Sequence, residues 1–340
     1  MSSSTPIYAS FRSIGAYVPE KILSNSDLET MVDTSDEWIT KRTGIKERRI
    51  AARDEYTSDM GTKASLKAIK RADIDIEDID LVICATVTPD YFNMPSTACV
   101  ISDKLGIRDV QAFDISAACS GFVYLLSLAK AFIESGMKKN ILIVGAEKFS
   151  SIVDYTDRGT CILFGDGAGA AIISAANNRE EGIVDIHASA DGSYSDFLVT
   201  PAPGTIHPVS QTVIDEGLNF VQMRGNETFK LAVKTLTKDV VEILKKNSIS
   251  AKDIPHFIPH QANYRIIKAV GDALKMTSEQ VVVTVEKYGN TSAASIPMAI
   301  NDIYESGRLK SGELMLLDTF GGGLTWASAL LPFSGKTVEN

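Results

Sequence analysis

The feature that most constrains the fold of this chain is a weak internal repeat. The pair Asp-Ile at 78–79 returns at 253–254, 175 positions later, and the triplet Glu-Ser-Gly at 134–136 returns at 305–307, 171 positions later. Each triplet precedes a short apolar run of the kind that forms a buried strand. The order and near-constant spacing of these matches predict a duplicated fold, with two unrelated α/β stretches of similar turn chemistry as the alternative.

Both halves combine short apolar runs with longer runs of helical periodicity, which is typical of α/β proteins. We expect the first half to span residues 1–175 and the second to span residues 176–340. Residues 176–224 are irregular and contain several prolines, so a long excursion over the surface is expected there. The clearest strands are expected at 7–18, 81–87, 141–144, 281–285 and 314–317, with a last strand ending at 331, and the clearest helices at 56–72, 96–105 and 226–246.

Cys119 occupies the most informative position in the first half. It follows the apolar opening at 113–115 and begins an amphipathic run that ends at Gly136. A helix start presents unpaired N–H groups and about half a positive charge, and both favour a thiolate. This position predicts a reactive, easily ionised cysteine, while the alternative is a small buried cysteine packed at the helix start.

The repeat links Cys119 to two distant polar residues. A shift of 171 places Asn290 opposite Cys119, each at the start of a helix, and a shift of 175 places His260 opposite Ala85, each at the end of a strand. In a pseudo-twofold fold, helix starts from both halves converge on one pocket, so we expect Cys119, His260 and Asn290 to be neighbours. Taken alone, His260 is equally well explained as a structural histidine, and Asn290 as a helix cap.

A cysteine with a histidine and an asparagine indicates acyl or thioester chemistry. In a papain-like hydrolase the histidine is the base and the asparagine orients it, but the second cysteine and the aromatic residue of that local signature are absent here. In a second arrangement, the histidine and the asparagine donate hydrogen bonds to a thioester oxygen as it becomes an enolate.

Charge and composition exclude several classes of protein. The net charge of −9 argues against a general nucleic-acid binder, so an acidic partner needs a local basic patch. No stretch approaches the roughly 20 apolar residues of a membrane span, and the N-terminal sequence MSSSTPIYAS lacks the pattern of a signal peptide. We therefore expect a cytoplasmic protein with reduced thiols. No metal-binding pattern or dinucleotide site is expected from the cysteines (Cys84, Cys99, Cys119, Cys161), the histidines (His187, His207, His256, His260) or the glycine-rich run 164–171.

Six motifs, taken together, resemble those of one family. They are DTSDEWITKRTGI (33–45), AACSGF (117–122), DRGTCILFGDGAGA (157–170), PHQAN (259–263), KYGNTSAASIP (287–297) and FGGGLTW (320–326). Along nearly its whole length the chain is similar to the β-ketoacyl-acyl-carrier-protein synthase III family, the initiating condensing enzymes of bacterial fatty-acid synthesis. The resemblance implies a duplicated, thiolase-like α/β fold of five layers, αβαβα, in agreement with the repeat.

The resemblance also implies a two-step reaction that uses no metal or redox cofactor. Cys119 would take a short acyl group from acyl-CoA, with acetyl-CoA as the expected primer. The N–H groups of Cys119 and Gly322 would form the oxyanion hole, and Phe320 would support the site. Malonyl-acyl-carrier-protein would then lose CO₂, and His260 and Asn290 would stabilise the enolate whose carbon attacks the acyl-cysteine.

Five further positions match residues that bind CoA in the family. Trp38 and Arg158 would hold the adenine between them, and Arg42 would lie near a phosphate. Gly225 and Asn263 would contact the pantetheine arm. Without the resemblance, Trp38 is better explained as a tryptophan half-buried under charged neighbours.

Partners and primer are implied in the same way. Lys230 and Arg265 match the basic surface that receives the acidic carrier protein. The family is homodimeric, which implies a homodimer here. Met94 stands where many members have phenylalanine at the edge of the acyl pocket that the partner subunit contributes, and the adaptable methionine leaves acetyl, propionyl and short branched primers open. The alternatives are a related condensing enzyme of secondary metabolism with another primer or acceptor, and a non-catalytic acyl-CoA-binding relative.

Overall fold

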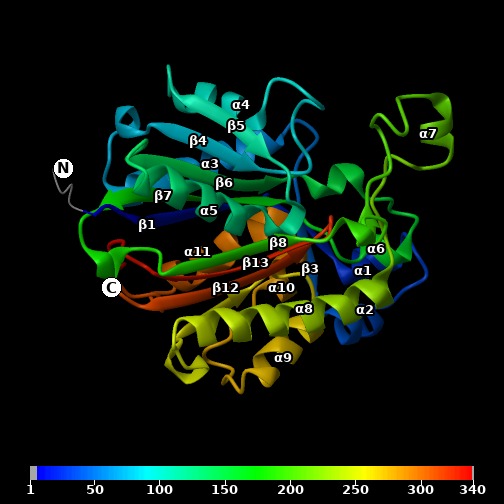
Figure 1. Cartoon of the computed structure of the whole chain (residues 1–340). Coiled ribbons are helices and arrows are strands. Elements are labelled where there is room, and N and C mark those ends of the chain that lie inside the picture. Colours follow the sequence, from blue (N-terminus) through cyan, green and yellow to red (C-terminus); the bar gives the residue numbers. More distant parts are fainter. Residues whose placement is uncertain (1–5, 339–340) are drawn as a thin grey trace.

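The chain folds into five layers, in which two β-sheets are separated by a pair of helices and covered by further helices on their outer faces (Figure 1). The computed structural model describes residues 6–338. Residues 1–5 and 339–340 lie outside the described residues, and the former make up half of the N-terminal stretch that was expected to lack a signal peptide.

The first sheet has five strands, in the order β1 (Tyr8–Tyr17), β7 (Gly167–Ala176), β6 (Asn140–Glu147), β4 (Leu81–Ala85) and β5 (Gln111–Ile115). β4 runs parallel to β5 and β6, whereas β7 runs antiparallel to β6 and β1. β4 and β6 are buried along almost their whole length, as expected for strands with helices on both faces.

The second sheet repeats this arrangement with four strands, in the order β8 (Asp185–Ala190), β13 (Thr325–Pro332), β12 (Leu314–Gly321) and β11 (His256–Pro259). β13 runs antiparallel to β8 and β12, and β11 runs parallel to β12. In the place of a fifth strand, Val281 forms a single parallel bridge with Phe257. Because strand order and directions match those of the first sheet, the predicted duplication is confirmed.

The helices form the remaining three layers. α5 (Gly121–Glu134) and α11 (Ser295–Glu305) pack between the two sheets. α3 (Thr57–Ala72) and α4 (Thr97–Leu105) cover the first sheet, and α8 (Gly225–Lys246) and α9 (Tyr264–Ala273) cover the second. One apolar cluster joins α5 and α11 to the inner faces of both sheets, and its burial fixes where the two central helices begin.

Short elements surround the sheets, and the connection that carries α7 projects from the body of the molecule (Figure 1). The short strands and α-helices are β2 (Lys21–Ser24), α1 (Asn25–Glu29), α2 (Asp36–Thr43), β3 (Glu47–Ile50), α6 (Arg158–Cys161), β9 (Leu198–Val199), α7 (Gln211–Asp215), β10 (Gln222–Met223) and α10 (Val285–Tyr288). The 3₁₀ turns are η1 (Ile76–Asp78), η2 (Ala118–Ser120), η3 (Phe149–Ile152), η4 (Arg179–Glu181), η5 (Gly192–Tyr194), η6 (Ala251–Asp253) and η7 (Ser292–Ala294).

The strand expected at 281–285 is wrong, since only Val281 pairs with the sheet. The side chain of Gln261 takes the place of a neighbouring strand. Its Nε2 donates to the carbonyl of Val282 at 3.1 Å, and its Oε1 accepts the N–H of Thr284 at 2.7 Å. A side chain from another segment therefore satisfies backbone groups that a strand would have paired with its neighbour.

The irregular excursion expected at 176–224 begins later than predicted. Residues 185–190 form β8 at the edge of the second sheet, and their half-buried or exposed side chains explain the weak hydrophobic pattern. The glycine-rich run from 167 belongs to β7, where a Cβ on Gly169 would lie only 2.5 Å from Pro297 of α11. The boundary between the halves at 175/176 stays a prediction.

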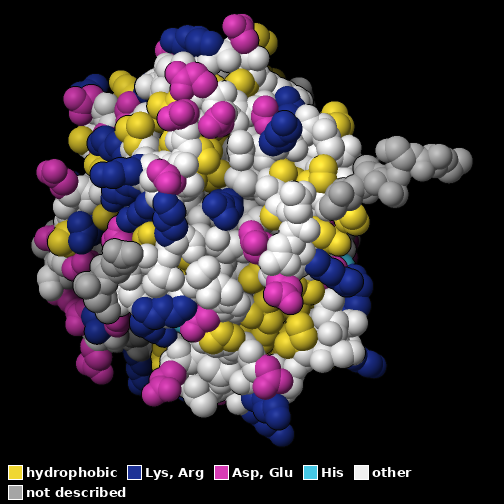
Figure 2. Space-filling view, turned by 90° about the vertical axis from the view of Figure 1, so that its left-hand side faces the viewer, with side chains coloured by type: hydrophobic (Ala, Val, Ile, Leu, Met, Phe, Trp, Pro, Cys, Tyr) yellow, Lys and Arg dark blue, Asp and Glu magenta, His cyan; other side chains and the backbone are white. Residues whose placement is uncertain are grey.

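The surface carries charges of both signs. Lys, Arg, Asp and Glu side chains are interspersed over the face in Figure 2, so this face presents no field of a single sign. Among residues 6–338, no helix has the length and apolar character to cross a bilayer. The same residues contain no group of three or more His, Cys, Asp or Glu side chains placed to hold a metal ion, and the four cysteines are free.

Candidate active site

Cys119 lies at the start of α5 and is held there by the second sheet. It belongs to η2, which begins at Ala118 and leads directly into α5. The carbonyl of Cys119 accepts the hydroxyl of Thr319 of β12 at 2.8 Å. Gly321 packs so closely that a Cβ on it would lie 2.6 Å from the Cys119 nitrogen. The end of β12 therefore sets the position of the cysteine.

The register of the repeat differs from the predicted one at this point. Ala118 has a left-handed φ of 45°, and its counterpart is Ser292 with a φ of 50°, 174 positions later. The structural counterpart of Cys119 is therefore Ala293, and not Asn290 as the shift of 171 predicted. α5 has 14 residues and α11 has 11. This difference of three residues explains why the shift is 174 at the helix starts but 171 at the Glu-Ser-Gly triplets that follow the helices.

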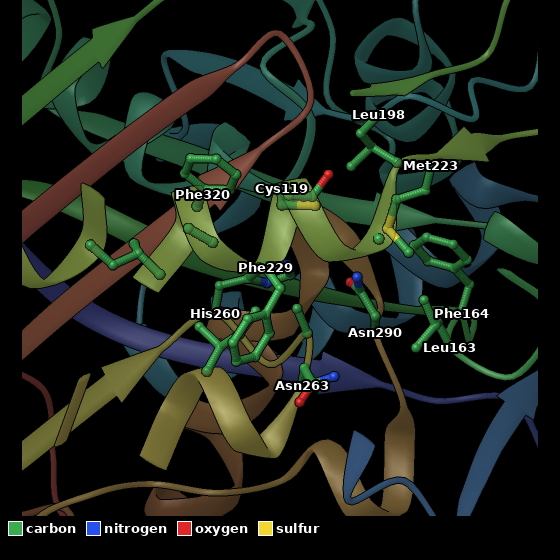
Figure 3. A pocket seen from close by; sticks show the side chains of 16 residues that line it. Cys119, Leu163, Phe164, Leu198, Met223, Phe229, His260, Asn263, Asn290 and Phe320 are labelled. Carbon is green, nitrogen blue, oxygen red and sulfur yellow. The ribbon is translucent and has the colours of Figure 1, made fainter. Parts of the chain in front are cut away.

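The three residues predicted to be neighbours nevertheless line one cavity of about 710 Å³, part of which is open to solvent. Figure 3 shows the side chains of Cys119, His260 and Asn290 around this cavity, with Phe320 at one end and Asn263 at the other. Each comes from a different part of the fold, because Cys119 lies in η2 just before α5, His260 follows β11 and Asn290 precedes η7.

His260 is fixed as a neutral ring. Its backbone N–H donates to the carbonyl of Asp318 at 2.7 Å, and its Nδ1 lies 2.6 Å from the hydroxyl of Ser295. Burial lowers the pKa of the imidazole to about 3. A neutral ring whose Nδ1 accepts the Ser295 hydroxyl proton carries its own hydrogen on Nε2. The geometry therefore supplies an uncharged hydrogen-bond donor.

Asn290 is held by its backbone and by one side of its amide. Its N–H donates to the carbonyl of Leu163 at 2.8 Å, and its carbonyl accepts the N–H of Gly165 at 3.0 Å. Its Oδ1 accepts the N–H of Ser292 at 2.9 Å, but the N-cap residue of η7 is Thr291, so Asn290 lies one position before the cap. The amide Nδ2 is left as a donor toward the cavity.

The prediction that Cys119 ionises easily is wrong for the structure as it stands. Its side chain is buried, and burial raises the pKa of the Cys119 thiol to about 12. The hydroxyl of Ser292 and the cysteine's own N–H lower this pKa, whereas the charge of Glu147 raises it. The thiol therefore stays protonated at neutral pH. Desolvation outweighs the favourable helix start.

Known proteins match this chain over its whole length. The family described as 3-oxoacyl-[acyl-carrier-protein (ACP)] synthase III matches residues 113–192, and its C-terminal part matches residues 244–333. The β-ketoacyl-[acyl-carrier-protein] synthase III of Sulfurovum sp. (strain NBC37-1) is 82% identical over 339 residues, which cover 100% of both chains. The chain belongs to the β-ketoacyl-acyl-carrier-protein synthase III family.

Further members of the synthase III family support the fold. The β-ketoacyl-[acyl-carrier-protein] synthase III of Sulfurimonas denitrificans is 71% identical over 330 residues, which cover 96% of this chain and 98% of the relative. The crystal structure of 3-oxoacyl-[acyl-carrier-protein] synthase III from Aquifex aeolicus VF5 has 44% identity and a TM-score of 0.87, and covers 95% of this chain and 99% of that chain. The thiolase-like five-layer fold implied by the resemblance is confirmed.

Two arginines lie over the ring of the tryptophan that is expected to bind CoA. Trp38 is half-buried on α2, with the guanidinium carbon of Arg42 at 4.6 Å and that of Arg158 at 4.8 Å from its ring centroid. A base placed between Trp38 and Arg158 requires a gap of roughly 7 Å, so Arg158 has to move away. Its Nη1 now donates to the carbonyl of Asp33 at 2.7 Å.

The other expected residues fall into two groups. Gly225, Asn263 and Phe320 line the cavity, and Asn263 also caps α9 through the N–H of Arg265 at 2.9 Å. Gly322 adjoins the start of α5, since a Cβ on it would lie 3.7 Å from the Cβ of Ala118.

Seven expected residues lie outside the cavity, namely Trp38, Arg42, Arg158, Gly322, Lys230, Arg265 and Met94. Lys230 of α8 and Arg265 of α9 are exposed on neighbouring helices, and the Arg265 guanidinium lies 5.0 Å from the ring of Phe229. Met94 is 81% exposed and does not line the cavity formed by this chain.

Sequence reasoning missed the residues that support the site. Ser295 holds His260, Thr319 and Gly321 hold Cys119, and Glu147 lies at the end of β6 close enough to affect the thiol. Two signals could have found them. Ser295 lies within the motif KYGNTSAASIP, and Glu147 and Thr319 are polar residues near the ends of mainly apolar strands.

Proposed function

We propose that this chain initiates fatty-acid synthesis by condensing a short acyl-CoA, acetyl-CoA in the first instance, with malonyl-acyl-carrier-protein to give a 3-oxoacyl-acyl-carrier-protein and CO₂. The observation that carries the proposal is one cavity lined by Cys119, His260 and Asn290 in a chain 82% identical to a β-ketoacyl-[acyl-carrier-protein] synthase III. The chain is thus an acyltransferase of the condensing type.

The first step is acyl transfer to Cys119. The sulfur attacks the thioester carbonyl, the carbonyl electrons move onto oxygen, and the tetrahedral intermediate expels CoA as its thiol. We assign the N–H groups of Cys119 and Gly322 to the oxyanion. The close packing of Gly321 against the Cys119 nitrogen supports this assignment, because it fixes the direction of one of the two donors.

The second step is decarboxylative condensation. The malonyl carboxylate leaves as CO₂, its bonding electrons form an enolate, and the enolate carbon attacks the acyl-cysteine and expels the Cys119 sulfur. We assign His260 Nε2 and Asn290 Nδ2 as the donors that hold the enolate oxygen. The lowered pKa of His260 supports this role, because a neutral ring donates a hydrogen bond without becoming an acid that protonates the carbanion.

Substrate binding completes the proposal. Trp38, Arg42 and Arg158 bind the nucleotide end of CoA, and Gly225 and Asn263 bind the pantetheine arm, which fits the lining of the cavity. Lys230 and Arg265 receive the carrier protein, and their exposure on adjacent helices gives an acidic partner the local positive charge it needs. Phe320 supports the catalytic residues.

We also propose a homodimer in which Met94 reaches the partner's acyl pocket. Met94 is 81% exposed, and its neighbours Tyr91 and Phe92 are 54% and 61% exposed. Three adjacent exposed apolar side chains fit a surface that a second subunit covers. The reaction as written needs neither a metal nor a redox cofactor, and the free cysteines fit a cytoplasmic setting.

Intact-protein mass spectrometry tests the proposal. We expect incubation with acetyl-CoA to add one acetyl mass and malonyl-acyl-carrier-protein to remove it as acetoacetyl-carrier-protein forms. Cys119→Ser should abolish the mass gain, whereas the control Cys99→Ser, which changes an exposed cysteine, should keep it. His260→Ala and Asn290→Ala should acylate but fail to condense.

Other outcomes identify the alternatives. An acyl-enzyme that malonyl-acyl-carrier-protein does not discharge, but another acceptor does, would indicate a condensing enzyme of secondary metabolism. Failure of Cys119 to acylate with acetyl, propionyl and branched acyl-CoA would indicate a non-catalytic acyl-CoA-binding protein.

A further inference from the structure

Glu147 is a buried carboxylate that the proposed mechanism leaves without a role. It ends β6 and its exposed fraction is 0%. The carboxylate accepts hydrogen bonds from the hydroxyls of Thr88 at 2.7 Å and Thr86 at 3.1 Å and from the N–H of Val87 at 3.1 Å. All three donors are neutral, and burial raises the pKa of Glu147 to about 7. A carboxyl held in this way can gain and lose a proton at neutral pH.

Ser292 connects Glu147 to the cavity. Its hydroxyl is buried and makes no hydrogen bond of regular geometry within residues 6–338, and its φ of 50° lies in the left-handed region. η7, which contains Ser292, packs against both β6, which ends at Glu147, and η2, which contains Cys119. The Ser292 hydroxyl lowers the pKa of the Cys119 thiol and of the Glu147 carboxyl. An unpaired buried hydroxyl on a strained backbone is costly, and such a cost is characteristic of functional sites.

The thiol of Cys119 needs a proton acceptor. Burial keeps it protonated at neutral pH, so acyl transfer requires the proton to leave as the sulfur attacks. His260 is a poor acceptor, since burial lowers its pKa to about 3 and Ser295 occupies its Nδ1. Glu147 is the carboxylate whose charge reaches the thiol.

We infer that Glu147 accepts the proton of Cys119 through the hydroxyl of Ser292 during acyl transfer, and returns it when condensation expels the Cys119 thiolate. The inference rests on the proposed function and adds a proton-holding residue to it. Glu147 acts through Ser292 and does not touch the substrate.

The protons and charges balance over the two steps. In acyl transfer, the Cys119 S–H proton passes to Ser292 while the Ser292 O–H proton passes to the Glu147 carboxylate, and the departing CoA thiolate takes a proton from solvent. In condensation, the malonyl carboxylate leaves as CO₂, the carbon–carbon bond forms, the carbon–sulfur bond of the acyl-cysteine breaks, and the thiolate takes the proton back along the same path. Glu147 is therefore uncharged when the malonyl carboxylate enters, which avoids two anions in one buried site.

The groups around Glu147 leave it free to take this proton. Lys148 follows it in the chain, but its ammonium donates to the carbonyls of Ala52 and Glu55, each at 2.7 Å. Cys84 of β4 is kept as a neutral thiol by burial, with the charges of Asp114 and Glu147 adding to the rise in its pKa. No cation holds Glu147 as a carboxylate in these contacts.

The pH dependence of Cys119 reactivity tests the inference. In the unmodified chain, we expect rates of acylation by acetyl-CoA and of alkylation by iodoacetamide to rise up to about pH 7 and then level off, because the acceptor is available only when Glu147 is ionised. In Glu147→Gln, both rates at pH 8 should fall about 10²-fold, and the break near pH 7 should disappear. Ser292→Ala, which keeps the carboxylate and its three donors, should give the same profile as Glu147→Gln.

Two results would overturn the inference. Glu147→Gln could react faster than the unmodified chain at every pH, which would mean that its charge only opposes the thiolate. Alternatively, both variants could keep the break near pH 7. The control is Asp114→Asn, which neutralises a carboxylate whose pKa is also raised by burial but which binds the N–H groups of Thr97 and Ala98 and should leave the profile unchanged.

The two reagents separate this inference from the proposed function. Alkylation by iodoacetamide needs no acyl-CoA, so it reports proton transfer from Cys119 even if acetyl-CoA proves not to be a substrate. A flat alkylation profile with normal acetylation would refute the role of Glu147 alone.

Discussion

In the first half of the molecule, Ala118 adopts a left-handed backbone just before the turn into α5, and in the second half Ser292 does the same before the turn into α11. The next residue is Cys119 in one half and Ala293 in the other. The two helix starts thus have the same backbone conformation but carry side chains of different reactivity. The first half carries Cys119, the proposed nucleophile, and the second carries His260 and Asn290, which stand before the turn rather than in it.

Each helix start is also held in place by a strand of the other half. The carbonyl of Cys119 accepts the Thr319 hydroxyl from β12 of the second half. The carbonyl of Ala293 packs closely against Gly145 of β6 in the first half. Gly145 and Thr319 are counterparts, 174 positions apart in strands of eight residues each. Each half therefore positions the helix start of the other, and neither half alone could form the site.

The largest expected effect comes from exchanging the two helix starts. We expect Cys119→Ala to reduce acyl transfer by roughly 10⁴-fold or more. Adding Ala293→Cys should not restore it, because Ala293 is buried against Gly145 and does not line the cavity. Intact mass after incubation with acetyl-CoA measures this directly. An acetyl group on the double variant would mean that the two helix starts are interchangeable, and would contradict the difference between the two halves.

The next largest effect is expected from adding a methyl group at the two glycines that pack against the helix starts. A Cβ from Gly321→Ala would lie 2.6 Å from the Cys119 nitrogen, and one from Gly145→Ala 2.5 Å from the Ala293 carbonyl oxygen. Each should cost about 1–3 kcal/mol of unfolding free energy, measured by denaturant titration.

The two glycine variants should differ in which step of the reaction they slow. Gly321→Ala moves the nucleophile and should slow single-turnover acylation about 10²-fold. Gly145→Ala moves the turn after Asn290, so it should leave acylation largely intact and slow the condensation step instead. Equal loss of acylation in both variants would contradict this arrangement, in which each helix start is held by a strand of the other half.

These contacts also show what the sequence could and could not predict. The strands β4, β6 and β12 and the helices α3, α4 and α8 were predicted because their hydrophobic periodicity is local. The residues at 281–285 were predicted wrongly because the side chain of Gln261, from another segment, decides their backbone bonding.

The site divides in the same way. Cys119, His260 and Asn290 could be picked out from the motifs, and the structure brings them to one cavity, although the repeat paired Asn290 with Cys119 in the wrong register. The acidity of Cys119 was predicted wrongly because desolvation depends on the packing of the whole chain, whereas the helix start is visible in the sequence. Glu147 carries no pattern of its own beyond a charge at the end of an apolar strand.

A smaller effect is expected from Thr319, whose hydroxyl donates to the Cys119 carbonyl across 200 positions of sequence. Thr319→Val leaves that buried carbonyl unpaired, so we expect about 1–3 kcal/mol lower unfolding free energy and a modest loss of acylation rate. Thr319→Ser keeps the hydroxyl and serves as the control. Equal rates for the valine and serine variants would show that the hydrogen bond does not position the cysteine.

The smallest effect on catalysis is expected at Asp318, whose counterpart in the first half is the apolar Val144. Asp318 is fully buried, neither carboxylate oxygen has a hydrogen-bond partner within residues 6–338, and burial, with the charge of Asp239, raises its pKa well above the ordinary value. The folded chain thus binds a proton that the unfolded chain releases above about pH 4. Stability should therefore fall as the pH rises from 4, by up to about 1.4 kcal/mol per pH unit until the folded-state pKa is reached.

Asp318→Val removes the titrating group and makes β12 resemble β6 at this position. We expect the variant to be more stable than the unmodified chain at pH 7, with a difference in melting temperature that shrinks as the pH approaches 4. Acylation should stay near its original rate, because only the backbone carbonyl of Asp318 contacts His260. A difference in stability that is independent of pH would mean that Asp318 is not protonated in the folded chain. A loss of acylation would mean that the carboxyl, which β6 does without, serves the active site of the second half.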